Sequence, residues 1–139
     1  MRTRVDGQIT GLAGELFVAA ELLKRGLQTS VTFGNAKAID LLAYNPDTQA
    51  TFTVQVKALR TNNYFLLSPS KVNRSHIYVF VVLNKPGQPV DYFVVPGADL
   101  AEDPKRFGRA YYEIEKMPGV LPSTLRKLNY QDAWDIFHQ

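Results

Sequence analysis

Residues 77–83 read Ile-Tyr-Val-Phe-Val-Val-Leu, a nearly unbroken run of apolar, aromatic and β-branched side chains. A strand with one face in water alternates apolar and polar residues, whereas a strand without that alternation is covered on both faces. The run therefore predicts a central strand of a sheet that has other elements packed on both sides. The rest of the chain has to supply those two covering layers.

Shorter patterns predict the elements around this strand. Gly26 follows an apolar-periodic segment and is a common helix terminator, which favours a first helix that ends just before it. The order of a helix, several strands and further helices around one sheet predicts an α/β three-layer sandwich with a central mixed β-sheet flanked by helices. We expect helices over residues 9–25 and 103–109, strands over 28–33, 38–44, 51–59, 64–67 and 92–95, and a closing helix anchored in the core by Trp134 and Phe137.

Size and composition restrict the class of protein. The chain has 139 residues and no evident interdomain linker, so we expect a single domain over residues 1–139. The absence of cysteine excludes a disulfide framework and a thiolate zinc site. Without a signal-peptide pattern or an apolar run long enough to span a bilayer, we expect a cytoplasmic protein with no membrane partner. The net charge of +3 allows a polyanionic partner.

The helical periodicity of residues 9–25 predicts which face of the first helix is buried. Leu12, Leu16, Ala19 and Leu23 fall on one stripe of the helical wheel, so we expect them to face the core. Glu15 falls at the edge of that stripe. A carboxylate there needs a cationic partner or a metal, because burying an isolated charge is costly.

The strands over residues 38–44 and 51–59 flank the turn sequence Asn-Pro-Asp-Thr at 45–48, which predicts a hairpin. If Asn45 and Ala50 close this hairpin, Asp40 lies opposite Gln55. Alternation along the second strand places Gln55 and Lys57 on one face. The hairpin thus brings an acid, an amide and a lysine together.

These residue types suit the metal-assisted cleavage of a phosphodiester bond. Mg²⁺ prefers oxygen ligands, which Asp40, Gln55 and the main-chain carbonyl of Val56 can supply. Glu15 could bind the ion directly or hold a water molecule bound to it. Lys57 could contact the scissile phosphate and orient the attacking water. We therefore expect a Mg²⁺ site, with Mn²⁺ as a substitute, whose protein groups are Glu15, Asp40, Gln55, Val56 and Lys57.

Three segments, residues 11–15, 39–43 and 54–58, resemble the PD-(D/E)XK nuclease superfamily, the restriction-endonuclease-like fold. The similarity is greater to its small Holliday-junction-resolvase-like members, which carry a glutamate on the first helix. The resemblance covers about the first two-thirds of the chain. It implies a Mg²⁺-dependent DNA endonuclease with Asp40 and Gln55 as metal ligands, Lys57 as the catalytic lysine and Glu15 completing the site.

Two positions depart from the motif of that family. Ile39 takes the place of the proline before the aspartate, and Gln55 takes the place of the usual Asp or Glu, which gives a Gln-x-Lys variant. Gln55 removes one negative charge, which should weaken Mg²⁺ binding. The alternative function is therefore a catalytically weak or inactive module on the same fold that binds nucleic acid or protein. An unrelated α/β domain is a third hypothesis.

Purely structural roles compete with these assignments. Glu15 could form an ion pair with Lys57 or Lys37, and Asp40 could cap a backbone amide at the end of its strand. His76, just before the apolar strand, is expected to be structural or to face solvent.

Basic residues near the proposed site are candidates for phosphate contacts. We expect Arg60, Lys71 and Arg74 to bind nucleic acid, with an ordinary solvated loop as the alternative. Cleavage of both strands of duplex DNA, or of a branched DNA, needs two active sites, so we expect a homodimer.

Overall fold

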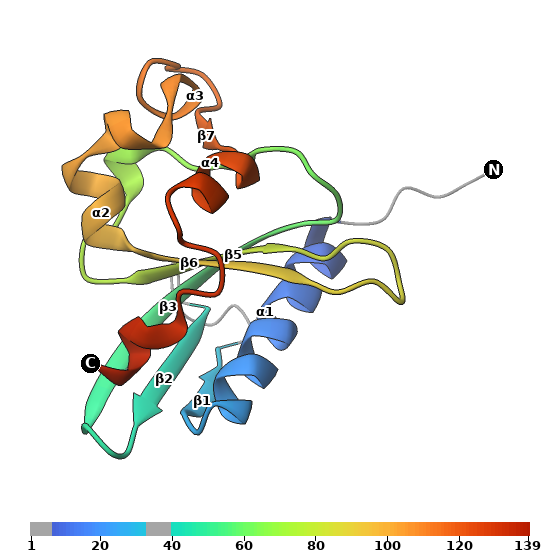
Figure 1. Cartoon of the computed structure of the whole chain (residues 1–139), viewed down its shortest axis with the longest axis vertical. Coiled ribbons are helices and arrows are strands. Elements are labelled where there is room, and N and C mark those ends of the chain that lie inside the picture. The colour runs from blue at the N-terminus through green and yellow to red at the C-terminus, as the bar shows by residue number, and fades with distance from the viewer. Residues whose placement is uncertain (1–6, 33–39) are drawn as a thin grey trace.

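A computed structural model describes residues 7–32 and 40–139 of the chain (Figure 1). Its centre is a five-stranded sheet in the order β1-β2-β3-β5-β6. The pairing of β3 with β5 is parallel and the other pairings are antiparallel, which makes the sheet mixed, as predicted. The strands are β1 (Gln28–Val31), β2 (Leu41–Asn45), β3 (Ala50–Leu59), β5 (Ile77–Val82) and β6 (Asp91–Pro96).

The predicted central strand is β5, and every residue of it is buried. Its side chains contribute to two separate hydrophobic clusters, one on each face of the sheet. Val79 and Val81 point to one cluster, and Tyr78, Phe80 and Val82 point to the other. The absence of alternation in the sequence therefore has the expected cause, which is burial on both sides.

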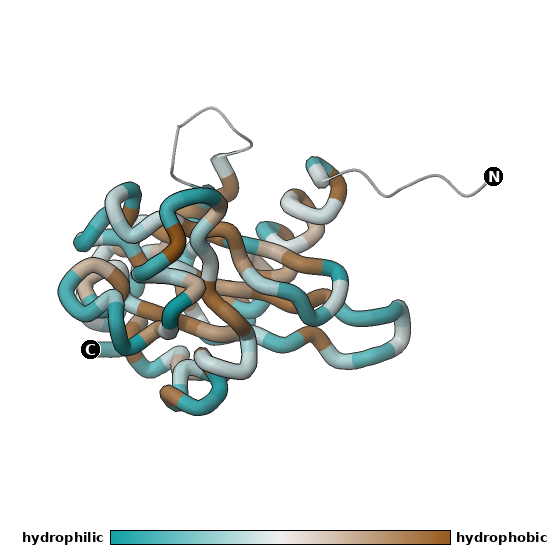
Figure 2. The backbone as a smooth tube through the Cα atoms, turned by 90° about the horizontal axis from the view of Figure 1, so that it is seen from above, coloured by the Kyte–Doolittle hydropathy of each residue, from teal (hydrophilic) through white to brown (hydrophobic). Residues whose placement is uncertain are grey.

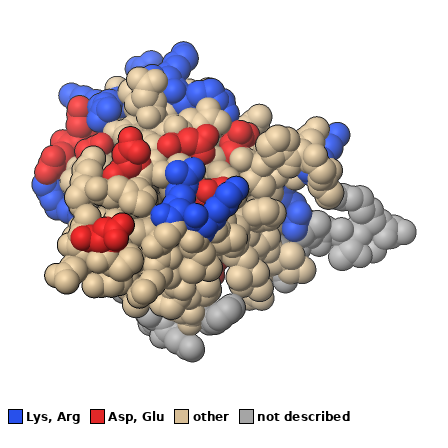
Figure 3. All heavy atoms as spheres, turned by 60° about the horizontal axis from the view of Figure 1, so that its bottom comes forward, with Lys and Arg blue, Asp and Glu red and all other residues tan. Residues whose placement is uncertain are grey.

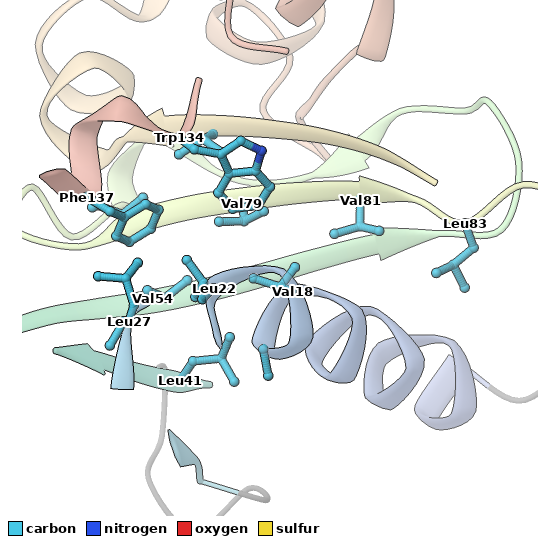
Figure 4. Close-up of a cluster of buried hydrophobic side chains, with 14 residues drawn as sticks. Val18, Leu22, Leu27, Leu41, Val54, Val79, Val81, Leu83, Trp134 and Phe137 are labelled. Atoms are coloured by element: carbon cyan, nitrogen blue, oxygen red, sulfur yellow. The ribbon is translucent and has the colours of Figure 1, made fainter. Parts of the chain in front are cut away.

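The first layer consists of helix α1 (Gly7–Lys24) and the 3₁₀-helix η3 (Trp134–His138), which pack on the same face of the sheet (Figure 1). Val18 and Leu22 of α1 meet Val79 of β5 in the core, with Trp134 and Phe137 beside them (Figure 4). Trp134 and Phe137 are buried, as expected for core anchors. Figure 2 shows the hydrophobic residues concentrated along the strands in the middle of the molecule.

The third layer covers the opposite face with short elements. It includes the helices α2 (Gly97–Glu102), α3 (Arg109–Tyr112) and α4 (Pro122–Lys127), whose buried side chains join the Tyr78 and Phe80 cluster. A small antiparallel sheet of β4 (Phe65–Leu66) and β7 (Gly119–Val120) belongs to the same layer. Two 3₁₀-helices, η1 (Pro69–Lys71) and η2 (Pro104–Phe107), complete the described elements.

The buried face of α1 differs from the prediction. Leu12, Leu16 and Leu23 are 42%, 46% and 54% exposed, and Ala19 alone of the predicted stripe is buried. The residues that face the sheet are Gly14, Val18, Ala19 and Leu22. The prediction was wrong because α1 is apolar on two sides. A helix with a small residue at its contact face packs closer to a sheet, and Gly14 provides that contact.

The predicted hairpin register is confirmed over the whole of β2. Leu41 pairs with Val54 and Asn45 pairs with Ala50. The Asn45 side chain stabilises the turn, because its Oδ1 accepts hydrogen bonds from the backbone amides of Asp47 (2.9 Å) and Thr48 (3.4 Å). This arrangement is the local turn that asparagine favours.

The last third of the chain is less well predicted. The helix expected over residues 103–109 is the 3₁₀-helix η2, which lies between the short helices α2 and α3, and the closing helix is also 3₁₀. The helices α2 and α4 were not predicted. Each has only six residues, too short for helical periodicity to show. The last residue of the strand predicted over 28–33 and the first two residues of the strand predicted over 38–44 lie outside the described residues.

No helix within residues 7–32 and 40–139 has the length and apolar character needed to cross a bilayer.

Candidate functional site

Asp40 lies at the point where the hairpin pairing ends. Its backbone N–H donates to the carbonyl oxygen of Val54 (3.0 Å), one residue out of step with the ladder that starts at Leu41. Its own carbonyl oxygen accepts a hydrogen bond from the backbone N–H of Thr32 (3.0 Å). These contacts place Asp40 just beyond the ladder, between β3 and the residue that follows β1. The predicted pairing of Asp40 with Gln55 was therefore wrong, because the ladder ends at Leu41 and Val54.

The Asp40 carboxylate turns toward β3. Its Oδ2 accepts a hydrogen bond from the backbone N–H of Val56 at 2.7 Å, so the carboxylate is fixed beside the residue between Gln55 and Lys57. The alternative of a bond to a backbone amide is thus confirmed. It is compatible with metal binding, because a carboxylate has about four lone-pair sites and one hydrogen bond uses only one of them.

Glu15 reaches the same region from α1. Partial burial raises the pKa of its carboxyl above the ordinary value of 4.5, and the negative charge of Asp40 raises it further. The helix therefore brings a second carboxyl close enough to Asp40 for the two charges to repel. A cation between two such carboxylates would favour the ionised form of both.

The alternative role of Glu15 as an ion-pair partner finds no support in the described structure. Among residues 7–32 and 40–139, no ion pair joins Glu15 to Lys57. The other partner considered, Lys37, lies outside the described residues.

Gln55 is buried and its side-chain nitrogen is held by two neighbours. Nε2 donates to the hydroxyl oxygen of Tyr78 at 3.0 Å and lies 2.9 Å from Nδ1 of His76. The backbone N–H of Asn73 also donates to the Tyr78 hydroxyl, at 2.9 Å. Because these contacts occupy the amide nitrogen, the carbonyl oxygen Oε1 is the part of Gln55 suited to a cation.

The partners of Gln55 were not predicted to belong to the site. Burial lowers the pKa of His76, which keeps its ring neutral at pH 7 and allows Nδ1 to accept the hydrogen bond from Gln55. Tyr78 stands directly beside Gln55 because β5 pairs with β3 in parallel at that position. The one sequence signal was Tyr78 itself, whose polar tip interrupts the apolar run.

Lys57 opens onto two neighbouring cavities. The larger, of about 630 Å³, is lined by both Gln55 and Lys57. The two residues pair with Tyr78 and Phe80 of β5, whose side chains lie on one face of the sheet, as the predicted alternation requires. The second, of about 470 Å³, is lined by Val56 and Lys57. A substrate in either cavity would lie against the lysine.

The ligand set for a metal would be small. In the described part of the chain, no three His, Cys, Asp or Glu side chains lie close enough together to hold an ion. A site here would have two carboxylates, Glu15 and Asp40, and would need the Gln55 amide and the Val56 main-chain carbonyl as further oxygen ligands. Such all-oxygen donors suit Mg²⁺, which usually keeps several water ligands.

The three predicted nucleic-acid contacts have different surroundings. Lys71 lines the larger cavity with Gln55 and Lys57. Arg60 follows β3 and its Nε donates to Thr10 Oγ1 of α1 at 3.1 Å, whereas Arg74 forms an ion pair with Glu102. On the face shown in Figure 3, Lys and Arg lie among Asp and Glu, so the residues coloured there form no continuous basic track.

The fold of this chain is shared with a nuclease of known structure. No protein-family model matches the chain, and no curated protein matches it. Among solved structures, a bacterial homing endonuclease, I-Ssp6803I, is similar with a TM-score of 0.58 and 14% sequence identity, over 96% of this chain and 95% of that chain. At this identity the likeness concerns the fold, and it confirms the predicted three-layer α/β sandwich with a mixed central sheet.

Proposed function

We propose that this chain is a metal-dependent endonuclease that hydrolyses phosphodiester bonds of DNA, a Gln-x-Lys variant of the PD-(D/E)XK superfamily. The observation that carries the proposal is the hydrogen bond from Val56 N–H to Asp40 Oδ2, which fixes an acid beside Gln55 and Lys57. Support also comes from the fold, since the similar structure I-Ssp6803I is described as a homing endonuclease.

The carboxylates of Glu15 and Asp40, the Gln55 oxygen and the Val56 carbonyl would hold Mg²⁺ or Mn²⁺. A divalent ion bound there supplies charge neutralisation at the phosphate and lowers the pKa of a bound water. Lys57 faces the adjoining cavities, where its ammonium group would contact the scissile phosphate and orient the attacking water. The anchored nitrogen of Gln55 keeps its oxygen available for this role.

Phosphate contacts away from the cleaved bond would position the DNA without reading its sequence. Lys71 is the best placed of the three predicted residues, because it shares a cavity with Lys57. Arg60, which follows the last residue of β3, would contact the DNA backbone beyond Lys57. Arg74 would have to exchange its carboxylate partner Glu102 for a phosphate, so its contribution would be smaller.

The second candidate function is binding of DNA or a protein with weak or no cleavage. The observation that favours it is the neutral amide at Gln55. A neutral amide in place of a carboxylate leaves the ion with two carboxylates, Glu15 and Asp40. If they bind the ion too weakly, the same surface would bind DNA or a protein without cutting.

Cleavage of supercoiled, single-stranded and branched DNA separates the two functions. We expect cleavage with Mg²⁺ or Mn²⁺ that stops with chelator, and a loss of about 100-fold or more in rate for Asp40→Asn and Lys57→Ala. Asp47→Asn and Lys85→Ala are matched controls, because both residues are exposed in hairpin turns. Activity that survives in Asp40→Asn and Lys57→Ala would rule out this site. Binding without any cleavage would favour the second function.

A further inference from the structure

The two cavities beside Lys57 are separated by an apolar ridge. Leu66 and Met117 line both cavities, as does Lys57, so the three residues form the boundary between them. Leu66 is 51% exposed and Met117 is 65% exposed. Two large apolar side chains thus project into solvent next to the proposed catalytic lysine, and we call Leu66 and Met117 the apolar ridge.

The backbone beneath the ridge is well supported. Leu66 belongs to β4 and pairs with Gly119 of β7, and the backbone N–H of Leu67 donates to the carbonyl of Pro118 at 2.9 Å. Gly119 packs so closely that a Cβ atom there would lie 2.6 Å from the carbonyl oxygen of Phe65. This small sheet lies beside α3 and α4 (Figure 1). The ridge is therefore held in place before any ligand arrives.

The surroundings of the ridge select a particular chemistry. The larger cavity presents the cations of Lys57 and Lys71, and Glu115 is the one acidic side chain among the described residues of its lining. The smaller cavity presents Asn63 and Tyr64. The cations of the larger cavity and the apolar ridge beside them match a nucleotide, which has an anionic phosphate and a flat base with apolar faces.

We propose that the apolar ridge enters a base step next to the scissile phosphate, so the preferred substrate is DNA whose stacking is already open, in a single strand or at a branch. Apolar Leu and Met side chains act as such wedges in other DNA complexes, and opening a stacked step costs a few kcal/mol. A continuous duplex would have to supply that energy, whereas a branched or single strand would not. The inference rests on the proposed function, because it places DNA at Lys57.

Equilibrium binding tests the inference in the absence of cleavage. The full chain is titrated, with Ca²⁺ in place of Mg²⁺, against fluorescently labelled single-stranded DNA, four-way junctions and continuous duplex. Leu66→Ser and Met117→Ser are compared with Ile114→Ser, an exposed apolar residue that lines neither cavity. A 2-aminopurine base at the branch point or in the single strand reports stacking against the ridge.

We expect each ridge variant to bind open DNA about 5- to 100-fold more weakly, to bind continuous duplex unchanged, and to lose the 2-aminopurine response. Ile114→Ser should behave as the wild type. Equal losses on open and continuous DNA, or no loss on either, would overturn the inference. So would a ridge that contacts a protein partner and not DNA, since DNA binding would then be unaffected.

The cleavage assay separates this inference from the proposed function. If the wild type cuts DNA and its ridge variants bind DNA like the wild type, the role of the ridge is contradicted and the nuclease function is not. If the wild type does not cut DNA and the ridge variants lose binding to open DNA, the role of the ridge is supported and the nuclease function is contradicted.

Discussion

At the scale of single residues, Glu15 is a carboxyl that the fold makes harder to ionise. Burial raises its pKa above the ordinary 4.5, and the charge of Asp40 raises it further. Below about pH 4.5 the group is protonated in both the folded and the unfolded chain, so it does not lower the stability of the fold. As the pH rises through the raised folded pKa, the unfolded chain releases the proton more easily, and stability is lost.

We therefore expect Glu15→Gln to raise the melting temperature at pH 7, and the gain to shrink as the pH falls below the unfolded-state pKa. Mg²⁺ should stabilise the wild type more than the variant, because a cation favours the ionised carboxylate. Thermal unfolding between pH 4 and pH 8, with and without Mg²⁺, measures both effects. A variant less stable than wild type at pH 7 without metal would contradict the proximity of Glu15 and Asp40.

In the proposed site, Gln55 would limit how strongly an ion is held. Gln55→Glu adds a carboxylate of nearly the same shape, and the Tyr78 hydroxyl can rotate to donate to it. We expect the variant to bind Mg²⁺ about tenfold more tightly, since ligand charge is a main determinant of affinity. Isothermal titration calorimetry measures the change, with Asp47→Glu as the control. Unchanged affinity would show that Gln55 does not touch the ion.

At the scale of elements, the approach of α1 to β3 depends on Gly14. A Cβ atom placed there would lie 2.6 Å from the Cβ of Ala58, whereas one placed at Gly11 would meet nothing within 4 Å. Overpacking lowers the stability of a protein by about 1–3 kcal/mol, whereas replacing a helical glycine by alanine raises it by up to about 1 kcal/mol.

We expect Gly14→Ala to lower the free energy of unfolding, and the matched Gly11→Ala to raise it by about 0.5–1 kcal/mol. Urea denaturation of both variants measures the difference. Because Glu15 follows Gly14, a helix pushed away from β3 should also reduce any DNA cleavage. Two equally stabilising substitutions would mean that α1 does not pack on β3 as closely as described.

The elements also show what the sequence could and could not predict. The β2–β3 register was predictable, because the turn at Asn45 and the alternation in β3 both specify it. The buried face of α1 was not, because Leu12, Leu16 and Leu23 form an apolar stripe as regular as the one that packs on the sheet. The partners of Gln55 depend on the parallel pairing of β3 with β5, which no local pattern encodes.

At the scale of the whole molecule, the outer stripe of α1 offers a face for the expected homodimer. Ile9, Leu12, Leu16, Ala20 and Leu23 are all exposed on the described helix. In an antiparallel pair of α1 helices with a two-fold axis at Leu16, Ile9 of each copy meets Leu23 of the other, and Leu12 meets the small Ala20. A surface that complements itself in this way is what a two-fold interface requires.

We therefore expect a dimer that Leu16→Glu disrupts, because two like charges would face each other at the axis. Light scattering after gel filtration measures the mass, with Leu42→Glu as a control at an exposed leucine on β2. A dimer that persists in Leu16→Glu, or a wild type that is monomeric at all concentrations, would contradict this interface.

The central claim for the molecule is that Asp40, held against β3, binds a divalent ion with its neighbours. Anomalous diffraction from crystals grown with Mn²⁺ tests it directly. We predict a manganese peak at coordination distance, about 2.2 Å, from an Asp40 carboxylate oxygen and from an oxygen of Gln55, Val56 or Glu15. The peak should vanish in Asp40→Asn crystals. Manganese bound elsewhere, or a peak unchanged in Asp40→Asn, would contradict the account.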